Sequence, residues 1–221
     1  MVVCFGRSIV RSMYIVVAGL HVPGLQHPSV ARFLKASVEE VVLLAVAVYL
    51  VHRQGRSLKD LGFGSTRVTP GIRDLFPAAY LAIGSSVASY FVQCWLLIVA
   101  WLDGLRLQTH HMNVGFIHVA HSSALVKAVA AAAVVVNPIY EESLVRAYLM
   151  TEIIYFTRKP WLALIVSVLV QASYHLYQGV VPAISYLGLF GVFAYFYMRT
   201  GRIWPVILAH MILDGIAVFL H

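Results

Sequence analysis

Two adjacent glutamates and an arginine directly follow a long apolar run in this sequence. Glu141, Glu142 and Arg146 come after the stretch ALVKAVAAAAVVV, which has the composition of a lipid-facing helix. On a helix, Glu142 and Arg146 share one face, whereas Glu141 is rotated away by about 100°. The spacing therefore predicts that Glu142 pairs with Arg146 and that Glu141 is left free. The same three residues could instead form a structural ion pair between two helices.

Two later segments place histidines inside apolar runs. His175 lies in SYHLYQG, and His210 and Asp214 are four residues apart in AHMILDG, so that the last two share a helical face. An ionisable side chain at mid-membrane costs at least about 2.5 kcal/mol, and those that persist usually face a cavity or a partner. We therefore treat all three as candidate site residues.

The combined set of side chains is suited to the attack of water on a carbonyl group. A glutamate would act as the base, a nearby imidazole would share the water, and the second imidazole would donate to the developing oxyanion. The same set could bind a divalent metal such as zinc through His175, His210 and Glu141, with an open position for water. The sequence leaves both versions open.

The composition indicates an integral membrane protein. The chain has 221 residues, of which 61% are hydrophobic and 11% are charged, and its mean hydropathy is +0.83. Soluble proteins are usually about 45–50% apolar and about 25% charged. We expect an all-α, polytopic bundle of about six to eight transmembrane helices with a polar intramembrane cavity, because each span takes roughly 20 residues. Residues 1–221 are expected to form a single membrane domain.

The apolar runs and the proline residues suggest where the helices lie. We expect apolar segments near 9–25, 38–52, 75–102, 115–136, 139–156, 160–176, 181–198 and 203–220. Pro138 is expected to kink or divide the region 115–156, because proline removes a backbone donor and clashes with the preceding turn. The runs 160–176 and 181–198 are expected to form a hairpin.

The positive charge is concentrated in short connections. A net charge of +7 could indicate a nucleic-acid partner, but the basic residues cluster at 52–74, at Arg158 and Lys159, and at Arg199 and Arg202. By the positive-inside rule, such clusters mark cytoplasmic connections between spans. We therefore expect the lipid bilayer, and no nucleic acid, as a partner.

Three motifs in this order resemble those of the CAAX prenyl protease and bacteriocin-processing family of intramembrane proteases, also called the Abi family. The motifs are EExxxR at 141–146, SYHLYQG around His175 and HxxxD at 210–214, and the likeness covers about 120–220. The resemblance implies an intramembrane endopeptidase in which Glu141 and His175 activate water. It further implies that His210 and Asp214 position or stabilise the intermediate, with metal in a metalloprotease version. Glu142 and Arg146 would support them.

The resemblance also implies a membrane-anchored protein or peptide as substrate, and the plasma membrane of a prokaryote as the location. The chain departs from the family pattern at three places. Gln171 replaces a common phenylalanine, Ala147 a glycine, and Asp214 a common asparagine. We expect the first two changes to adjust packing. The third adds a negative charge next to His210, where it could favour metal.

Other interpretations remain open at this level. A non-catalytic immunity or scaffold protein could retain the fold of the family, and a transporter is a third possibility, although the repeat symmetry that transporters often have is missing. Glu39 and Glu40 begin an apolar run and are expected to be interfacial. The histidines at 110, 111, 118 and 121 are expected to lie in a solvated interfacial segment rather than to bind metal.

Overall fold

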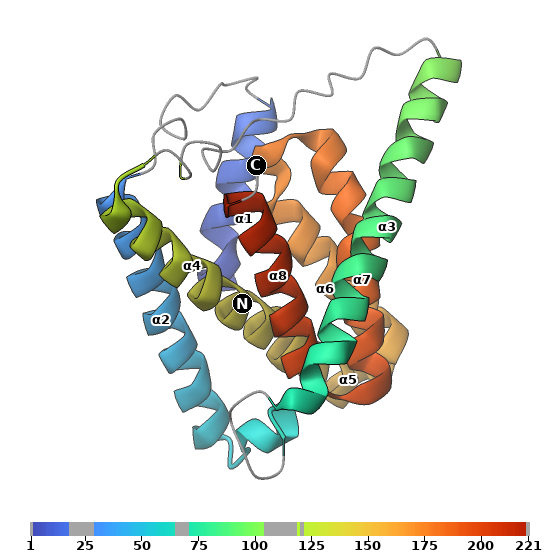
Figure 1. Ribbon diagram of the computed structural model, residues 1–221. Coiled ribbons are helices and arrows are strands. Elements are labelled where there is room, and N and C mark those ends of the chain that lie inside the picture. Colours follow the sequence, from blue (N-terminus) through green and yellow to red (C-terminus); the bar gives the residue numbers. More distant parts are fainter. Residues whose placement is uncertain (1, 18–28, 65–70, 104–118, 120–121, 220–221) are drawn as a thin grey trace.

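The structure is a computed structural model that describes residues 2–17, 29–64, 71–103, 119 and 122–219. Within these ranges the chain forms helices and the turns between them (Figure 1). The prediction of an all-α membrane bundle is confirmed. The histidines at 110, 111, 118 and 121 lie outside the described residues, so the expectation made for them stays a prediction.

The helices overlap the predicted apolar runs, although the first begins at Val2 rather than near 9 and the second at Val30 rather than near 38. The α-helices are α1 (Val2–Val17), α2 (Val30–Arg53), α3 (Ile72–Leu102), α4 (Ala124–Glu142), α5 (Thr151–Thr157), α6 (Pro160–Tyr174), α7 (Val180–Thr200) and α8 (Trp204–Phe219). Short 3₁₀ turns occur at η2 (Leu58–Leu61) and η4 (Leu176–Gln178), and η3 (Ser143–Met150) is a π-helix. As expected from the hairpin prediction, α6 and α7 are joined by η4 and pack against each other.

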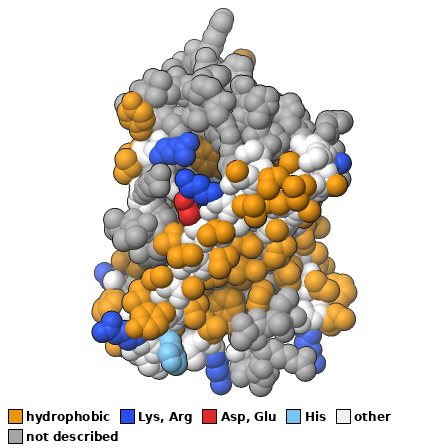
Figure 2. Space-filling view, turned by 90° about the vertical axis from the view of Figure 1, so that its left-hand side faces the viewer, with side chains coloured by type: hydrophobic (Ala, Val, Ile, Leu, Met, Phe, Trp, Pro, Cys, Tyr) orange, Lys and Arg blue, Asp and Glu red, His pale blue; other side chains and the backbone are white. Residues whose placement is uncertain are grey.

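Three helical segments are long and apolar enough to cross a membrane. Among the described residues these are Ile72–Leu102, Ala124–Thr157 and Val180–Thr200, and two shorter apolar helices, α6 and α8, accompany them. Figure 2 shows hydrophobic side chains over most of the described surface of one face, with Lys and Arg in its upper part and near its lower edge. Such an apolar exterior is suited to lipid contact.

Pro138 was expected to kink or divide the region 115–156, and the division is wrong. Pro138 is buried within α4, and α4, η3 and α5 run on as one helical segment, Ala124–Thr157. The irregularity falls one turn later, in the π-helix that begins at Ser143. Proline is tolerated in membrane helices where neighbouring groups and local changes of helix type compensate for its missing donor. Turns of π-helix often occur at functional sites.

Two further contacts hold the bundle around this segment. In Figure 1, α4 (yellow-green) lies between α2 and α8, and it contacts both helices. On the other side, α7 packs closely against α3 at Gly188, where an added Cβ would lie 2.6 Å from the carbonyl oxygen of Ala88. Small residues allow membrane helices to approach in this way. The C-terminal end of α4, which carries the two glutamates, is buried among these neighbours.

Candidate active site

Glu142, at the end of α4, is the centre of a buried polar cluster. Its side chain is completely buried, and its Oε2 lies 3.4 Å from Nε of Arg146, as the i, i+4 spacing predicts. The guanidinium of Arg146 also lies over the ring of Phe190, with Cζ 5.3 Å from the ring centroid. A buried charge is tolerated only when it is paired, so the two residues depend on each other.

Glu142 has two more partners, which the sequence spacing does not reveal. Nδ1 of His210 in α8 lies 2.8 Å from its Oε1, and Nε2 of Gln171 in α6 donates to the same oxygen at 3.0 Å. Glu142 therefore joins α4, α6 and α8 as well as pairing with Arg146. Its position is consistent with the predicted supporting role. In addition, Glu142 orients the ring of His210.

Glu141 is held by three donors and faces a different direction. Asn137 donates from Nδ2 to Oε1 at 3.1 Å, and Tyr174 and Gln171 donate to Oε2 at 2.6 Å and 3.2 Å. A carboxylate offers about four acceptor positions on its two oxygens. One position, on Oε1, is therefore left for a further donor such as water.

The two imidazoles are oriented by their Nδ1 atoms. Nδ1 of His175 lies 2.8 Å from the carbonyl oxygen of Gln171, which can only accept, so Nδ1 carries the hydrogen and Nε2 is left as an acceptor. Nδ1 of His210 likewise faces the acceptor Glu142. Nε2 of His210 lies 3.6 Å from Oδ1 of Asp214, which is longer than a hydrogen bond. Both rings thus have their Nε2 atoms available to a ligand.

A cavity of about 210 Å³ connects the predicted residues. Its lining includes Glu141, His175, His210 and Asp214, which come from α4, the turn after α6, and α8. The two glutamates diverge as expected, because Glu141 faces this cavity whereas Glu142 lies behind it against Arg146. The structure therefore brings all four predicted catalytic candidates to one hollow.

Sequence reasoning missed two side chains in the same cavity and misjudged a third. Asn137 was considered only with Pro138, and Glu40 was expected to be interfacial; both line the cavity and bond to each other. The interfacial prediction did not include this contact of Glu40 with the site. Gln171 was expected to adjust packing, yet it donates to both glutamates. The i, i+4 spacing of Asn137 and Glu141 was the one available signal.

The positions of these side chains determine whether they could bind a metal ion. The orientation of each histidine by an Nδ1 acceptor is common among metal ligands. However, no three His, Cys, Asp or Glu side chains within the described ranges are grouped so that they could hold a metal ion. As placed, His175, His210 and Glu141 do not fit a metal, and their predicted metal role stays a prediction.

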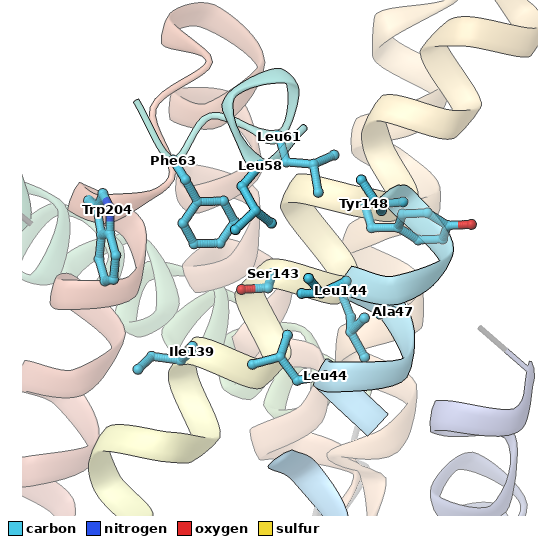
Figure 3. A pocket seen from close by; sticks show the side chains of 12 residues that line it. Leu44, Ala47, Leu58, Leu61, Phe63, Ile139, Ser143, Leu144, Tyr148 and Trp204 are labelled. Carbon is cyan, nitrogen blue, oxygen red and sulfur yellow. The ribbon is translucent and has the colours of Figure 1, made fainter. Parts of the chain in front are cut away.

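A second cavity lies on the opposite side of the same helical segment. It has a volume of about 160 Å³ and is lined mainly by apolar side chains of α2, η2, η3 and the start of α8 (Figure 3). Ile139 and Ser143 face this cavity, whereas Asn137 and Glu141 face the polar one. The helix that carries the glutamates therefore separates an apolar hollow from a polar one.

The fold and the site define a class of protein: a helical membrane bundle with a buried glutamate and histidine site. Residues 123–216 match the family model described as Rce1-like, type II CAAX prenyl endopeptidase Rce1-like. This match contains all three motifs and confirms the resemblance stated from the sequence. It supports a CAAX-type intramembrane protease in general. Comparisons with curated proteins and with solved structures gave no significant match.

Proposed function

We propose that this protein is an intramembrane endopeptidase that hydrolyses a peptide bond of a membrane-associated protein or peptide. The observation that carries the proposal is the convergence of Glu141, His175 and His210 on one polar cavity inside an apolar bundle. A polar hollow among lipid-facing helices is costly to maintain, and it usually marks a functional site. Water-dependent chemistry fits this set of groups better than a purely structural role does.

The first step is the activation of water. A water in the cavity would donate to the remaining acceptor position on Oε1 of Glu141, while Nε2 of His175 accepts its second hydrogen. The three donors to Glu141 hold its carboxyl group in one orientation during this step. Such positioning lowers the entropy cost of reaching the transition state.

The second step is attack on the scissile carbonyl group. The water oxygen bonds to the carbonyl carbon, Glu141 takes one proton, and the carbonyl oxygen becomes an oxyanion. With Glu142 against Nδ1 and Asp214 near Nε2, His210 is suited to carry a hydrogen on each ring nitrogen, and this imidazolium would donate from Nε2 to the oxyanion. When the carbon–nitrogen bond breaks, the proton on Glu141 passes to the leaving amine. The products are one carboxylic acid and one amine.

This mechanism uses only the side chains of the chain itself. A metal, if bound, would polarise the carbonyl group or lower the pKa of its water. The residues as placed do not form a metal-binding group, so no step is assigned to one. Asp214 would orient His210, and Glu142 with Arg146 would fix the helices around it.

Cleavage of quenched fluorescent peptides, with and without a C-terminal prenylcysteine, by the protein purified in detergent tests the proposal. We expect Glu141→Gln to lower kcat by about 10²–10⁴-fold, the usual contribution of a general base. Glu39→Gln is the matched control, because Glu39 is an exposed glutamate that pairs with Lys35. Cleavage by Glu141→Gln at the wild-type rate would contradict the mechanism. An unchanged biological effect of a Glu141→Gln protein would favour a non-catalytic scaffold.

A further inference from the structure

Glu40 lies on α2, outside the segment that matches the family model, yet its side chain reaches the polar cavity. It is separated from Asn137 by 97 positions in the sequence, and the packing of α2 against α4 brings the two together. The neighbouring Glu39 points elsewhere, is exposed, and lies 3.9 Å from Nζ of Lys35. Only one of the two adjacent glutamates is therefore directed at the site.

One amide group connects Glu40 to Glu141. Nδ2 of Asn137 donates to Oε1 of Glu40 at 3.0 Å and to Oε1 of Glu141 at 3.1 Å. An amide nitrogen carries two hydrogens, so each carboxyl group can receive one of them. Oε1 of Glu141 is also the oxygen with the acceptor position left for water. The amide thus contacts the reacting side of the proposed base.

The orientation of the Asn137 amide decides whether that contact is favourable. An asparagine side chain can be turned so that its oxygen, rather than its nitrogen, faces a given neighbour. If Oδ1 of Asn137 faced Glu141, two acceptors would meet and the contact would be repulsive. Glu40 is an acceptor on the same nitrogen, so it selects the orientation in which the nitrogen lies between the two carboxyl groups.

Resting on the proposed function, we propose that Glu40 is a positioning residue for Glu141 that acts through the amide of Asn137. It touches neither the water nor the substrate in this role. Its contribution is to keep the Asn137 nitrogen, and with it Oε1 of Glu141, in a single orientation. If this single orientation is lost, the chemical step should become slower while substrate binding stays nearly unchanged, because misplacement of a catalytic group mainly lowers kcat.

The test compares four single variants in the peptide-cleavage assay: Glu40→Leu, Glu40→Gln, Asn137→Ala and the control Glu39→Leu. Glu40→Leu replaces the acceptor by an apolar side chain of similar size, whereas Glu40→Gln keeps an acceptor oxygen. We expect Glu40→Leu to lower kcat by at least about tenfold with KM little changed. Glu40→Gln should retain most of the activity, and Glu39→Leu all of it. Thermal unfolding of each variant in detergent establishes that it is folded.

A double-mutant cycle gives the sharper measurement. If Glu40 acts through Asn137, then Glu40→Leu should have almost no further effect on kcat in an Asn137→Ala background, because coupled residues are not additive. Additive losses would overturn the proposal. So would a Glu40→Leu protein that cleaves at the wild-type rate while Glu141→Gln is inactive, and this result would leave the proposed function intact.

Two remaining outcomes are also decisive. If Glu40→Leu does not fold, the cycle is run with Glu40→Gln and Glu40→Ala, and equal losses in both would overturn the proposal, because Gln keeps the acceptor and Ala does not. If Glu141→Gln cleaves like the wild type, the proposed mechanism fails, and the positioning role fails with it, whereas the absence of cleavage by the wild type would overturn the proposed function itself. Full activity in Glu40→Gln with a large loss in Glu40→Ala supports the proposal.

Discussion

Nδ1 of His210 lies 2.8 Å from Oε1 of Glu142, so the glutamate that pairs with Arg146 also orients the histidine of the last helix. Glu142 thereby pairs through Oε2 with Arg146 on its own helical segment and through Oε1 with His210 on α8, and Oε1 also accepts from Gln171 on α6. The ion pair that was expected to support the site is therefore directly connected to a candidate catalytic group.

Removal of Glu142 should destabilise the protein strongly. We expect Glu142→Ala to lower the free energy of unfolding by about 3–5 kcal/mol, because the fully buried Arg146 would be left without its counter-charge. Thermal unfolding in detergent measures the effect. The double variant Glu142→Leu with Arg146→Met should recover much of the loss, since it buries no charge. A Glu142→Ala protein as stable as the wild type would show that the pair contributes little.

Gln171 should affect both stability and activity, although its position was expected to matter only for packing. Gln171→Met keeps the length of the side chain but removes the donor to Glu141 and Glu142, so we expect a loss of about 1–3 kcal/mol in the free energy of unfolding. The kcat should fall as well, because Glu141 loses one of three donors. Gln93→Met, on α3 and outside the cavity lining, is the control. Equal effects of the two variants would argue against a specific role of Gln171.

Metal removal should leave cleavage unchanged. The expectation follows from the positions of His175, His210 and Glu141, which do not form a group that could hold an ion. The assay is repeated after treatment with a strong chelator, and the metal content is measured on the same sample. A loss of activity that zinc restores would show that these side chains rearrange around a metal.

Gly188 and Gly191 provide a matched test of helix packing. A Cβ at Gly188 would lie 2.6 Å from the carbonyl oxygen of Ala88 in α3, whereas a Cβ at Gly191, three residues later in α7, would meet no atom within 4 Å. We expect Gly188→Ala to cost about 1–3 kcal/mol by overpacking. Gly191→Ala should be neutral or slightly stabilising, because alanine favours the helix. Similar thermal unfolding of the two variants would contradict the close α3–α7 contact.

The local spacing of residues in the sequence was sufficient to predict several features of this protein. The apolar runs predicted the helices, the i, i+4 spacing predicted the Glu142–Arg146 pair, and the same spacing placed His210 and Asp214 on one face. These relationships depend only on the period of a helix, which is the same wherever the helix lies. The composition likewise determined the membrane class.

The convergence of distant side chains was decided by tertiary structure alone. Glu40 and Asn137 meet because α2 packs against α4, and Gln171 reaches both glutamates because α6 packs against η3. The π-helix after Glu142 likewise replaced the break expected at Pro138. Which side chains share a cavity depends on how the helices rotate and cross, and these variables are set by packing between segments far apart in the chain.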